Sequence, residues 1–147
     1  MALVDLPDIN VWIALSIPDH VHHERARTYW QAEAAAVSAF NTTTMLGLVR
    51  ICSSSPISKG APLTSMGAWS LYLQWMHLQE VNHLPEPRAC MVTLNNFVSA
   101  GLITGRTWTD AYLAAFAVSA SLRLVSFDSD FRRFPGLDFL HLKPEPL

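Results

Sequence analysis

The sequence predicts an α/β fold in which helices cover both faces of a mostly parallel sheet, that is, a three-layer α/β/α sandwich. Short apolar runs typical of buried strands alternate along the chain with longer segments whose apolar residues recur every three or four positions. Strands that alternate with helices pair in parallel, because each helix carries the chain back to the same edge of the sheet. With 147 residues and no internal repeat or linker, we expect one domain over residues 1–147.

The N-terminal half contains capping residues and breaks that divide it into short elements. Asp19 follows the break at Pro18 and is expected to cap a helix, because its carboxylate can accept from free backbone N–H groups. The predicted elements, in order, are a strand at 2–6, a helix from Asp8 to Leu15, a helix from Asp19, a strand at 36–40, a helix after Asn41–Thr43, and a loop at 56–63.

The C-terminal half has the clearest helical periodicity. In the segment from Thr109, the apolar residues Leu113, Phe116, Ala117 and Ala120 stand at i, i+3, i+4 and i+7, and Thr109 is the expected cap. The predicted elements are a helix at 64–78 with Trp69, Leu73 and Met76 on one face, a strand at 80–84, a helix at 88–100 stopped by Gly101, the helix from Thr109, and strands at 122–127 and 138–142.

The composition is apolar for a small domain. Half of the residues are hydrophobic and only 15% are charged, whereas charged residues are usually about a quarter. A large core would explain this excess, but a buried partner interface explains it better. The formal net charge of -2 gives no basic field for nucleic acid, which leaves room for a protein that holds phosphates through metal ions.

The cysteines and the apolar runs bear on the compartment. Cys52 and Cys90 match neither a disulfide framework nor a metal-ligand spacing, so we expect reduced, buried thiols. The N-terminus has no basic region before an apolar run, and no run reaches the roughly 18 to 20 apolar residues of a membrane span. We therefore expect a cytoplasmic protein without membrane contact.

Four of the seven aspartates stand where an α/β sheet places its functional groups. Asp8 follows the first predicted strand, and Asp128 and Asp130 follow the fourth. The crevice beyond the carboxyl ends of parallel strands is the usual binding site in such sheets. Asp110 lies in the first turn of a helix that should abut the same edge. We therefore expect these four carboxylates to lie close together.

Close carboxylates repel one another, and their ionised forms persist only beside a cation. Hard oxygen ligands suit Mg²⁺ or Mn²⁺, which can activate water and stabilise an in-line phosphodiester displacement. Each acid also has a structural explanation: Asp110 can stabilise the helix dipole, Asp128 and Asp130 can form a turn, and Asp8 can cap a helix. Their convergence from three segments favours a metal-dependent nuclease.

Three segments resemble the acidic motifs of PIN-domain ribonucleases, and most of all those of VapC-type toxins of bacterial toxin–antitoxin pairs. The segments are Asp8-Ile9-Asn10-Val11, Thr109-Asp110-Ala111-Tyr112-Leu113-Ala114, and Leu124-Val125-Ser126-Phe127-Asp128-Ser129-Asp130-Phe131. The segment Pro18-Asp19-His20-Val21-His22-His23-Glu24-Arg25-Ala26 resembles the stretch after the first motif in one VapC subgroup. The resemblance covers nearly the whole chain in order.

The resemblance implies a site, a reaction and partners. Asp8, Asp110 and Asp128 would hold Mg²⁺, with Asp130 as an additional or water-mediated ligand. Asn10 and Ser126 would orient the carboxylates and water from behind. The implied reaction is endonucleolytic hydrolysis of RNA by a toxin. The implied partners are a small VapB-type antitoxin, which lays a helix in a groove, and a second copy of the chain.

The sequence departs from the family at one acid. Many PIN domains carry a glutamate near the position of Gly47, where this chain has none, and we expect a weaker second metal site. Among the cations, Arg50 and Arg106 are candidates for contact with RNA or antitoxin, although a lone arginine can equally pair within the fold. Arg132 and Arg133 either touch the RNA backbone or only solvate a turn.

Other functions remain to be weighed against the nuclease. A catalytically silent PIN-like module that binds RNA or antitoxin is supported by the missing acid near Gly47. An aspartyl-phosphate enzyme is suggested by Asp8 after the first strand, but it would need an acid at Asn10 and a well-placed lysine. A serine hydrolase is excluded, because the serines at 53–55 have no nucleophile elbow. His20 and Glu24 alone make too thin a metal site.

Overall fold

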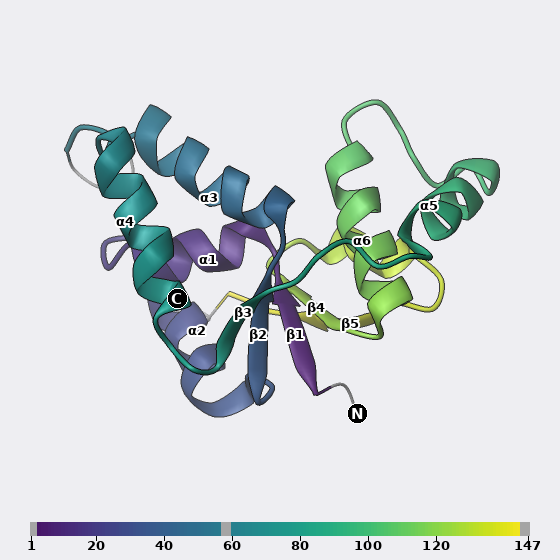
Figure 1. Cartoon of the computed structure of the whole chain (residues 1–147), viewed down its shortest axis with the longest axis horizontal. Coiled ribbons are helices and arrows are strands. Elements are labelled where there is room, and N and C mark those ends of the chain that lie inside the picture. Colours follow the sequence, from purple (N-terminus) through teal and green to yellow (C-terminus); the bar gives the residue numbers. More distant parts are fainter. Residues whose placement is uncertain (1–2, 57–59, 145–147) are drawn as a thin grey trace.

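The computed structural model describes residues 3–56 and 60–144 and confirms the expected α/β architecture. Five parallel strands form one sheet in the order β3-β2-β1-β4-β5, and helices flank it (Figure 1). The elements are β1 (Val4–Pro7), α1 (Ile9–Ser16), α2 (His23–Thr28), η1 (Tyr29–Glu33, a π-helical turn), β2 (Val37–Phe40), α3 (Thr42–Ser54), α4 (Ser65–Met76), β3 (Val81–His83), α5 (Cys90–Ser99), α6 (Trp108–Ala120), β4 (Arg123–Ser126), η2 (Ser129–Arg133, a 3₁₀ turn) and β5 (Asp138–His141).

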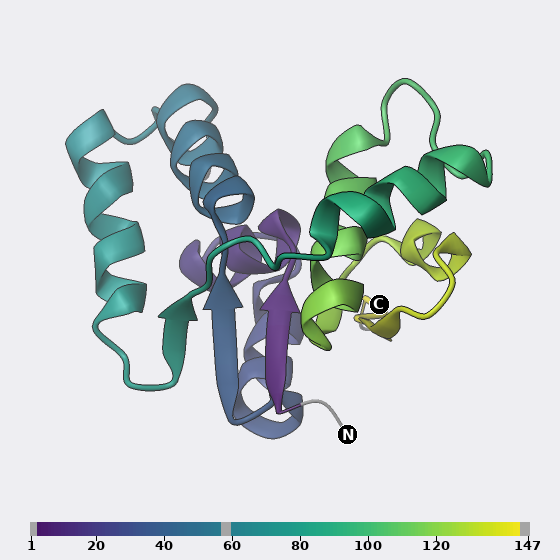
Figure 2. The ribbon, with the colours of Figure 1, turned by 45° about the vertical axis from the view of Figure 1, so that its right-hand side comes forward.

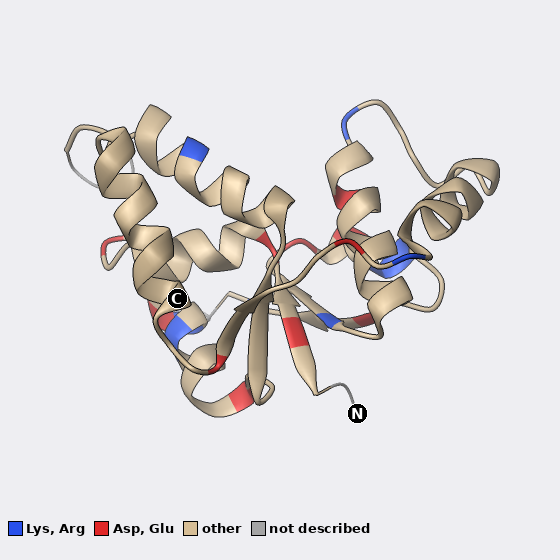
Figure 3. Cartoon of the chain, viewed as in Figure 1, with Lys and Arg blue, Asp and Glu red and all other residues tan. Residues whose placement is uncertain are grey.

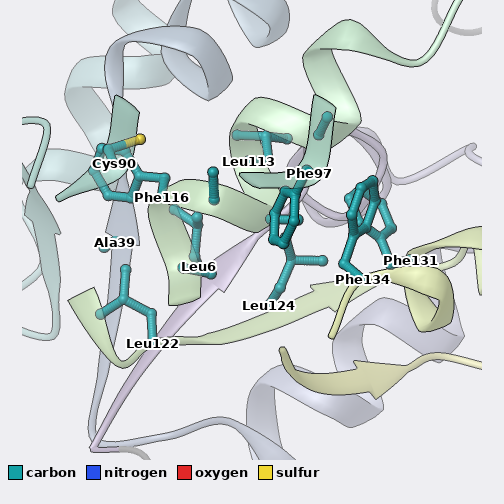
Figure 4. Close-up of a cluster of buried hydrophobic side chains, with 14 residues drawn as sticks. Leu6, Ala39, Cys90, Phe97, Leu113, Phe116, Leu122, Leu124, Phe131 and Phe134 are labelled. Atoms are coloured by element: carbon teal, nitrogen blue, oxygen red, sulfur yellow. The ribbon is translucent and has the colours of Figure 1, made fainter. Parts of the chain in front are cut away.

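The alternation of side chains along the strands divides the core between the two faces of the sheet. Leu6, Ala39 and Leu124 pack with α5 and α6 in one buried cluster (Figure 4). Their neighbours Phe40 and Val125 belong to separate clusters that include residues of α1. Burial on both faces explains why β1, β2 and β4 present apolar side chains to both layers of helices.

The strand order creates a switch point between β1 and β4. From β1 the chain moves to β2 and β3 on one side, and β4 and β5 then add to the other side. Two helix pairs, α3 with α4 and α5 with α6, diverge beyond the carboxyl ends of the strands (Figure 2). Ligands of open α/β sheets bind at such a switch point, so the ends of β1 and β4 are the region to examine.

Pro7 ends the pairing of β1 on one side only. The register of β1 with β2 covers Val4 and Asp5, whereas its register with β4 continues through Pro7. The ladder on the β4 side extends one bond further, from the Asp8 amide to the Val125 carbonyl at 2.8 Å. A proline has no amide hydrogen to donate, so it releases β1 from β2 and keeps Asp8 beside β4.

Two expected helix starts were wrong. The second helix begins at His23 rather than at Asp19, because residues 17–22 form turns in which His20 donates to the Ile17 carbonyl. The sixth begins at Trp108, and Thr109 lies inside it rather than capping it. The expected first strand began at Ala2, which lies outside the described residues.

The apolar face expected on α4 is largely exposed. Trp69 and Leu73 are 43% and 46% exposed, while Ala68 and Tyr72 form the buried face of this helix. Within residues 3–56 and 60–144, no helix is long and apolar enough to cross a membrane.

Gly47 of α3 lies against the side chain of Ile9 in α1. A Cβ built on Gly47 would lie 2.3 Å from Cδ1 and 2.6 Å from Cγ1 of Ile9. These contacts are far inside van der Waals distance, so a side chain here must displace the side chain of Ile9. The absence of an acid at this position therefore has a packing reason.

Gly47→Ala is expected to lower the free energy of unfolding by about 1 kcal/mol. Overpacking costs about 1–3 kcal/mol, which exceeds the gain of about 1 kcal/mol from replacing glycine within a helix. Urea denaturation measures the loss, and adding Ile9→Ala should relieve the clash. Gly105→Ala, with nothing within 4 Å of its Cβ, is the matched control; equal stability of the two variants would contradict the packing argument.

Candidate functional site

Asp8 is positioned by the junction between β1 and α1. It is the N-cap of α1, and its Oδ1 accepts from the Ile9 amide at 2.7 Å. Its side chain is buried, with 8% of the residue exposed. A buried carboxylate loses its hydration, so the groups around it decide whether it stays ionised.

Ser126, at the end of β4, links three of the candidate residues. Its hydroxyl donates to Asp8 Oδ2 at 2.8 Å and accepts from Asn10 Nδ2 at 3.1 Å. The same oxygen accepts from the Asp128 amide at 3.0 Å. Ser126 is completely buried. One hydroxyl thus fixes the Asp8 carboxylate relative to the turn that carries Asp128.

Asp128 and Asp130 share the tight turn after β4. Asp128 precedes η2 and its Oδ1 accepts from the Asp130 amide at 2.9 Å. Asp128 is half-buried, whereas Asp130 is exposed. Asp128 therefore closes a turn, which is the structural role that the sequence allowed. The bond from its amide to Ser126 also holds it near Asp8.

Asp110 completes the cluster from the first turn of α6. Burial raises its pKa, the nearby negative charge of Asp128 raises it further, and that of Asp130 adds to the effect. The positive charge of Arg133 acts in the opposite direction. No hydrogen bond holds the Asp110 carboxylate among the described residues, so its oxygens remain available to a ligand.

Both of the other acids, Asp110 and Asp128, affect the pKa of Asp8. Burial is the main cause that raises its pKa from 3.8 to about 6, and Asp110 and Asp128 contribute by repulsion. Hydrogen bonds from Ser126 and from the Ile9 amide limit the rise. Acids from three distant segments therefore interact at the switch point of the sheet, and Figure 3 shows acidic positions at the end of β1 and in α6.

The donor set fits a hard divalent cation. Mg²⁺ keeps several waters and needs only one or two carboxylates together with substrate phosphate oxygens. Three mutually repelling acids, one of them held by a hydroxyl, meet that need. In the described part of the chain, no group of three or more His, Cys, Asp or Glu side chains is placed so that it could hold a metal ion by itself. The ligand shell would therefore need water and substrate oxygens beside the carboxylates.

The candidate arginines differ in exposure: Arg50 and Arg106 are exposed, and Arg133 is half-buried. Arg50 is exposed in α3, and Arg106 is exposed in the turn before α6. Arg133 is the cation that acts on Asp110, and sequence reasoning gave it no such place. The sequence indicated it only as one of two adjacent arginines after Asp130. Its contact with Leu102, in the loop after α5, depends on the fold.

Stability of the metal-free protein is expected to fall as pH rises from about 4 to about 6. Below pH 3.8 the Asp8 carboxyl is neutral in both the folded and the unfolded protein, so its burial does not reduce stability. Because its pKa rises to about 6 on folding, its ionised form is disfavoured in the folded protein, and stability falls until about pH 6. The linked change is about 3 kcal/mol at 1.36 kcal/mol per pKa unit. Urea denaturation with chelator measures it, and Asp8→Asn should show a smaller decline, because the raised pKa of Asp110 remains. Added Mn²⁺ should restore stability above pH 6; a pH slope identical in both proteins would contradict the burial of an ionisable Asp8.

Ser126→Ala is expected to lower metal affinity and any metal-dependent activity about 10- to 100-fold, as the loss of a group that orients a ligand usually does. The change removes the hydrogen bond to Asp8 and leaves the Asp128 amide without its acceptor. Calorimetric titration with Mn²⁺ measures the affinity. Ser119→Ala is the control, because its hydroxyl bonds to carbonyls of its own helix. Equal affinities of the two variants would remove Ser126 from the site.

Comparison with known proteins gives consistent matches over almost the whole chain. A family model described as PIN domain matches residues 6–137. Ribonuclease VapC41 of Mycobacterium tuberculosis is 30% identical over 138 residues, which cover 90% of this chain and 94% of the relative. Ribonuclease VapC44 of the same organism is 31% identical over 142 residues, covering 93% and 96%.

Similar solved structures agree on the fold. Mycobacterium tuberculosis VapC20, described as a sarcin-ricin loop cleaving toxin, aligns with a TM-score of 0.69 at 12% identity, covering 91% of this chain and 97% of that one. DNA-bound VapBC from Salmonella typhimurium aligns with a TM-score of 0.66 at 17% identity, covering 97% and 100%. At these identities the likeness shows the fold alone.

Proposed function

The chain belongs to the PIN domain family, with VapC ribonucleases among its relatives, and from this premise we propose that it is a metal-dependent endoribonuclease that acts as the toxin of a VapBC-type pair. The observation that carries the proposal is the interaction of Asp8, Asp110 and Asp128 at the carboxyl ends of β1 and β4. Acids that repel one another at a sheet edge are suited to binding a divalent cation.

The side chains have separate roles in the proposed site. Asp8, Asp110 and Asp128 would hold Mg²⁺ or Mn²⁺, and exposed Asp130 would bind through water or as an additional ligand. Such an ion, when bound, lowers the pKa of a water and neutralises charge on a phosphodiester. Ser126 keeps the Asp8 carboxylate oriented, and Asn10 donates to Ser126. The chain therefore supplies carboxylates in fixed positions, and the proposed nucleophile is water rather than a side chain.

The proposed partners are RNA, a VapB-type antitoxin and a second copy of the chain. Arg50 and Arg106 are both exposed and so are available to RNA or to an antitoxin. The apolar surface on the α3–α4 pair, where Leu46, Trp69 and Leu73 are exposed, suits a homodimer, because large exposed apolar patches usually mark interfaces. Two free, buried cysteines are consistent with the reducing conditions of the cytoplasm, where we propose that the protein acts.

Cleavage of total bacterial RNA by the purified protein tests the proposal. We expect discrete fragments with Mg²⁺ or Mn²⁺ and none with a chelator. Asp19→Asn is the matched control for acid-to-amide changes, since Asp19 is exposed and lies in the turns after α1, outside the three acidic segments. Intact RNA under every metal condition would refute the nuclease.

A catalytically silent RNA- or antitoxin-binding module is the second candidate, and the packing at Gly47 favours it, because the Ile9 side chain fills the space that a further acid would need. The two functions separate in one experiment. Retained binding of RNA without any cleavage in Mn²⁺ would select the silent module.

A further inference from the structure

A hollow of about 470 Å³ lies between the turn before α6 and the turn η2, next to the acidic cluster. We call it the Arg133 hollow. One side belongs to the loop after α5 and the other to the residues that follow Asp128, so it shares Asp130 with the proposed metal site. Its lining residues are Leu102, Thr104, Thr107, Ser129, Asp130 and Arg133.

Arg133 is held in place without a direct ion pair, although its charge acts on Asp110. Its Nε donates to the Leu102 carbonyl at 3.3 Å and its Nη1 donates to the Asp130 carbonyl at 2.8 Å. The guanidinium lies 4.4 Å from the centre of the Phe134 ring, which belongs to the buried cluster in Figure 4. Its Nη2 is buried and has no hydrogen-bond partner, and no carboxylate lies within ion-pair distance of the guanidinium, among the described residues.

The rest of the lining suits a phosphate. The turn before α6 is closed by the Thr107 hydroxyl, which bonds to the amide and the carbonyl of Thr104. The hydroxyls of Thr104 and Ser129 form no hydrogen bond within the described chain. Arginine and hydroxyl groups are the usual side-chain partners of nucleic-acid phosphates. With a net charge of -2, a local cation matters more than any general field.

We propose that the Arg133 hollow binds the RNA phosphate adjacent to the scissile one. The proposal rests on the nuclease function. It implies that the RNA strand runs from the acidic cluster over η2 toward the turn before α6. Asp130 at the boundary is compatible with an anion, because a metal ion in the acidic cluster would offset its charge. Arg133 is a binding residue here and takes no part in the cleavage step.

The test uses an oligonucleotide that spans a site cut in total RNA. Arg133→Gln is expected to raise KM about tenfold, the value of one hydrogen bond to a charged group, with a smaller change in kcat. The dependence of log KM on log salt should become shallower by about 0.7, as for one phosphate contact on a single strand. Arg133→Lys should recover part of the affinity. Arg27→Gln, which removes one exposed charge, should leave KM unchanged.

A second variant separates binding from folding, since Arg133 also ties two loops together. Thr104→Glu adds a negative charge to the hollow and removes no hydrogen bond, so it should raise KM at least as much as Arg133→Gln. Gln31→Glu adds the same charge at an exposed, distant position and should have no effect. A wild-type protein that cuts RNA while both hollow variants keep its KM and salt dependence would overturn the subsite alone. A wild-type protein that cuts no RNA would overturn the nuclease and the subsite together.

Discussion

Asp8→Asn is expected to reduce RNA cleavage at least about 10²- to 10³-fold, the cost of losing one group that stabilises transition-state charge. The amide keeps the size of the side chain and can accept from the Ile9 amide, but it removes the charge that attracts a cation. The same change should stabilise the metal-free protein at pH 8, because the buried carboxylate, with its pKa of about 6, is then ionised at a cost.

Two measurements on the same samples check this prediction. Initial rates of cleavage in Mn²⁺ give the loss of activity, and urea denaturation with chelator gives the gain in stability. Asp19→Asn should change neither. A fully active Asp8→Asn protein would contradict the proposed site, and an inactive but less stable one would indicate that Asp8 matters mainly to the fold.

Arg123→Met is expected to cost about 3–5 kcal/mol of stability, the penalty for leaving a buried charge without its partner. Asp5 lies in the central strand β1 and is completely buried. Arg123 donates to Asp5 Oδ1 from Nε at 2.7 Å and to Oδ2 from Nη2 at 2.9 Å. The Tyr29 hydroxyl and the Ala35 amide also donate to Oδ2, but neither carries a charge.

Chemical denaturation measures the loss for Arg123→Met. Arg27→Met is the control, since the Arg27–Glu24 pair is exposed on both sides at 3.9 Å and such pairs contribute about 0–1 kcal/mol. Adding Asp5→Asn to Arg123→Met should recover part of the stability, because an amide needs no counter-charge. A loss below about 1 kcal/mol for Arg123→Met alone would show that the pair contributes little.

Local sequence patterns were enough to predict the layers and to place Asp8 and Asp128 at one edge of the sheet. The alternation of apolar runs predicted the parallel sheet, because strand and helix periods depend on neighbours only a few residues away. Asp8 and Asp128 could be placed at one edge because each directly follows a strand. The roles of the individual acids in metal binding remain predictions.

Features that depend on distant partners could not be predicted. Asp5 and Arg123 are 118 residues apart, and nothing near Asp5 in the sequence indicates a buried ion pair in the central strand. The contact of Gly47 with Ile9 depends on how closely two helices pack. Arg133 meets the Leu102 carbonyl only after both loops are in place. The start of α2 was misplaced because turn hydrogen bonds at residues 17–22 replaced the expected cap at Asp19.

Diffraction from crystals soaked in Mn²⁺, recorded for its anomalous signal, tests the central claim most directly. The expected result is one strong peak within coordination distance of carboxylate oxygens of Asp8, Asp110 and Asp128, absent from crystals of Asp8→Asn. A peak elsewhere on the molecule, or an unchanged peak in the variant, would contradict the claim that these three segments together hold the ion.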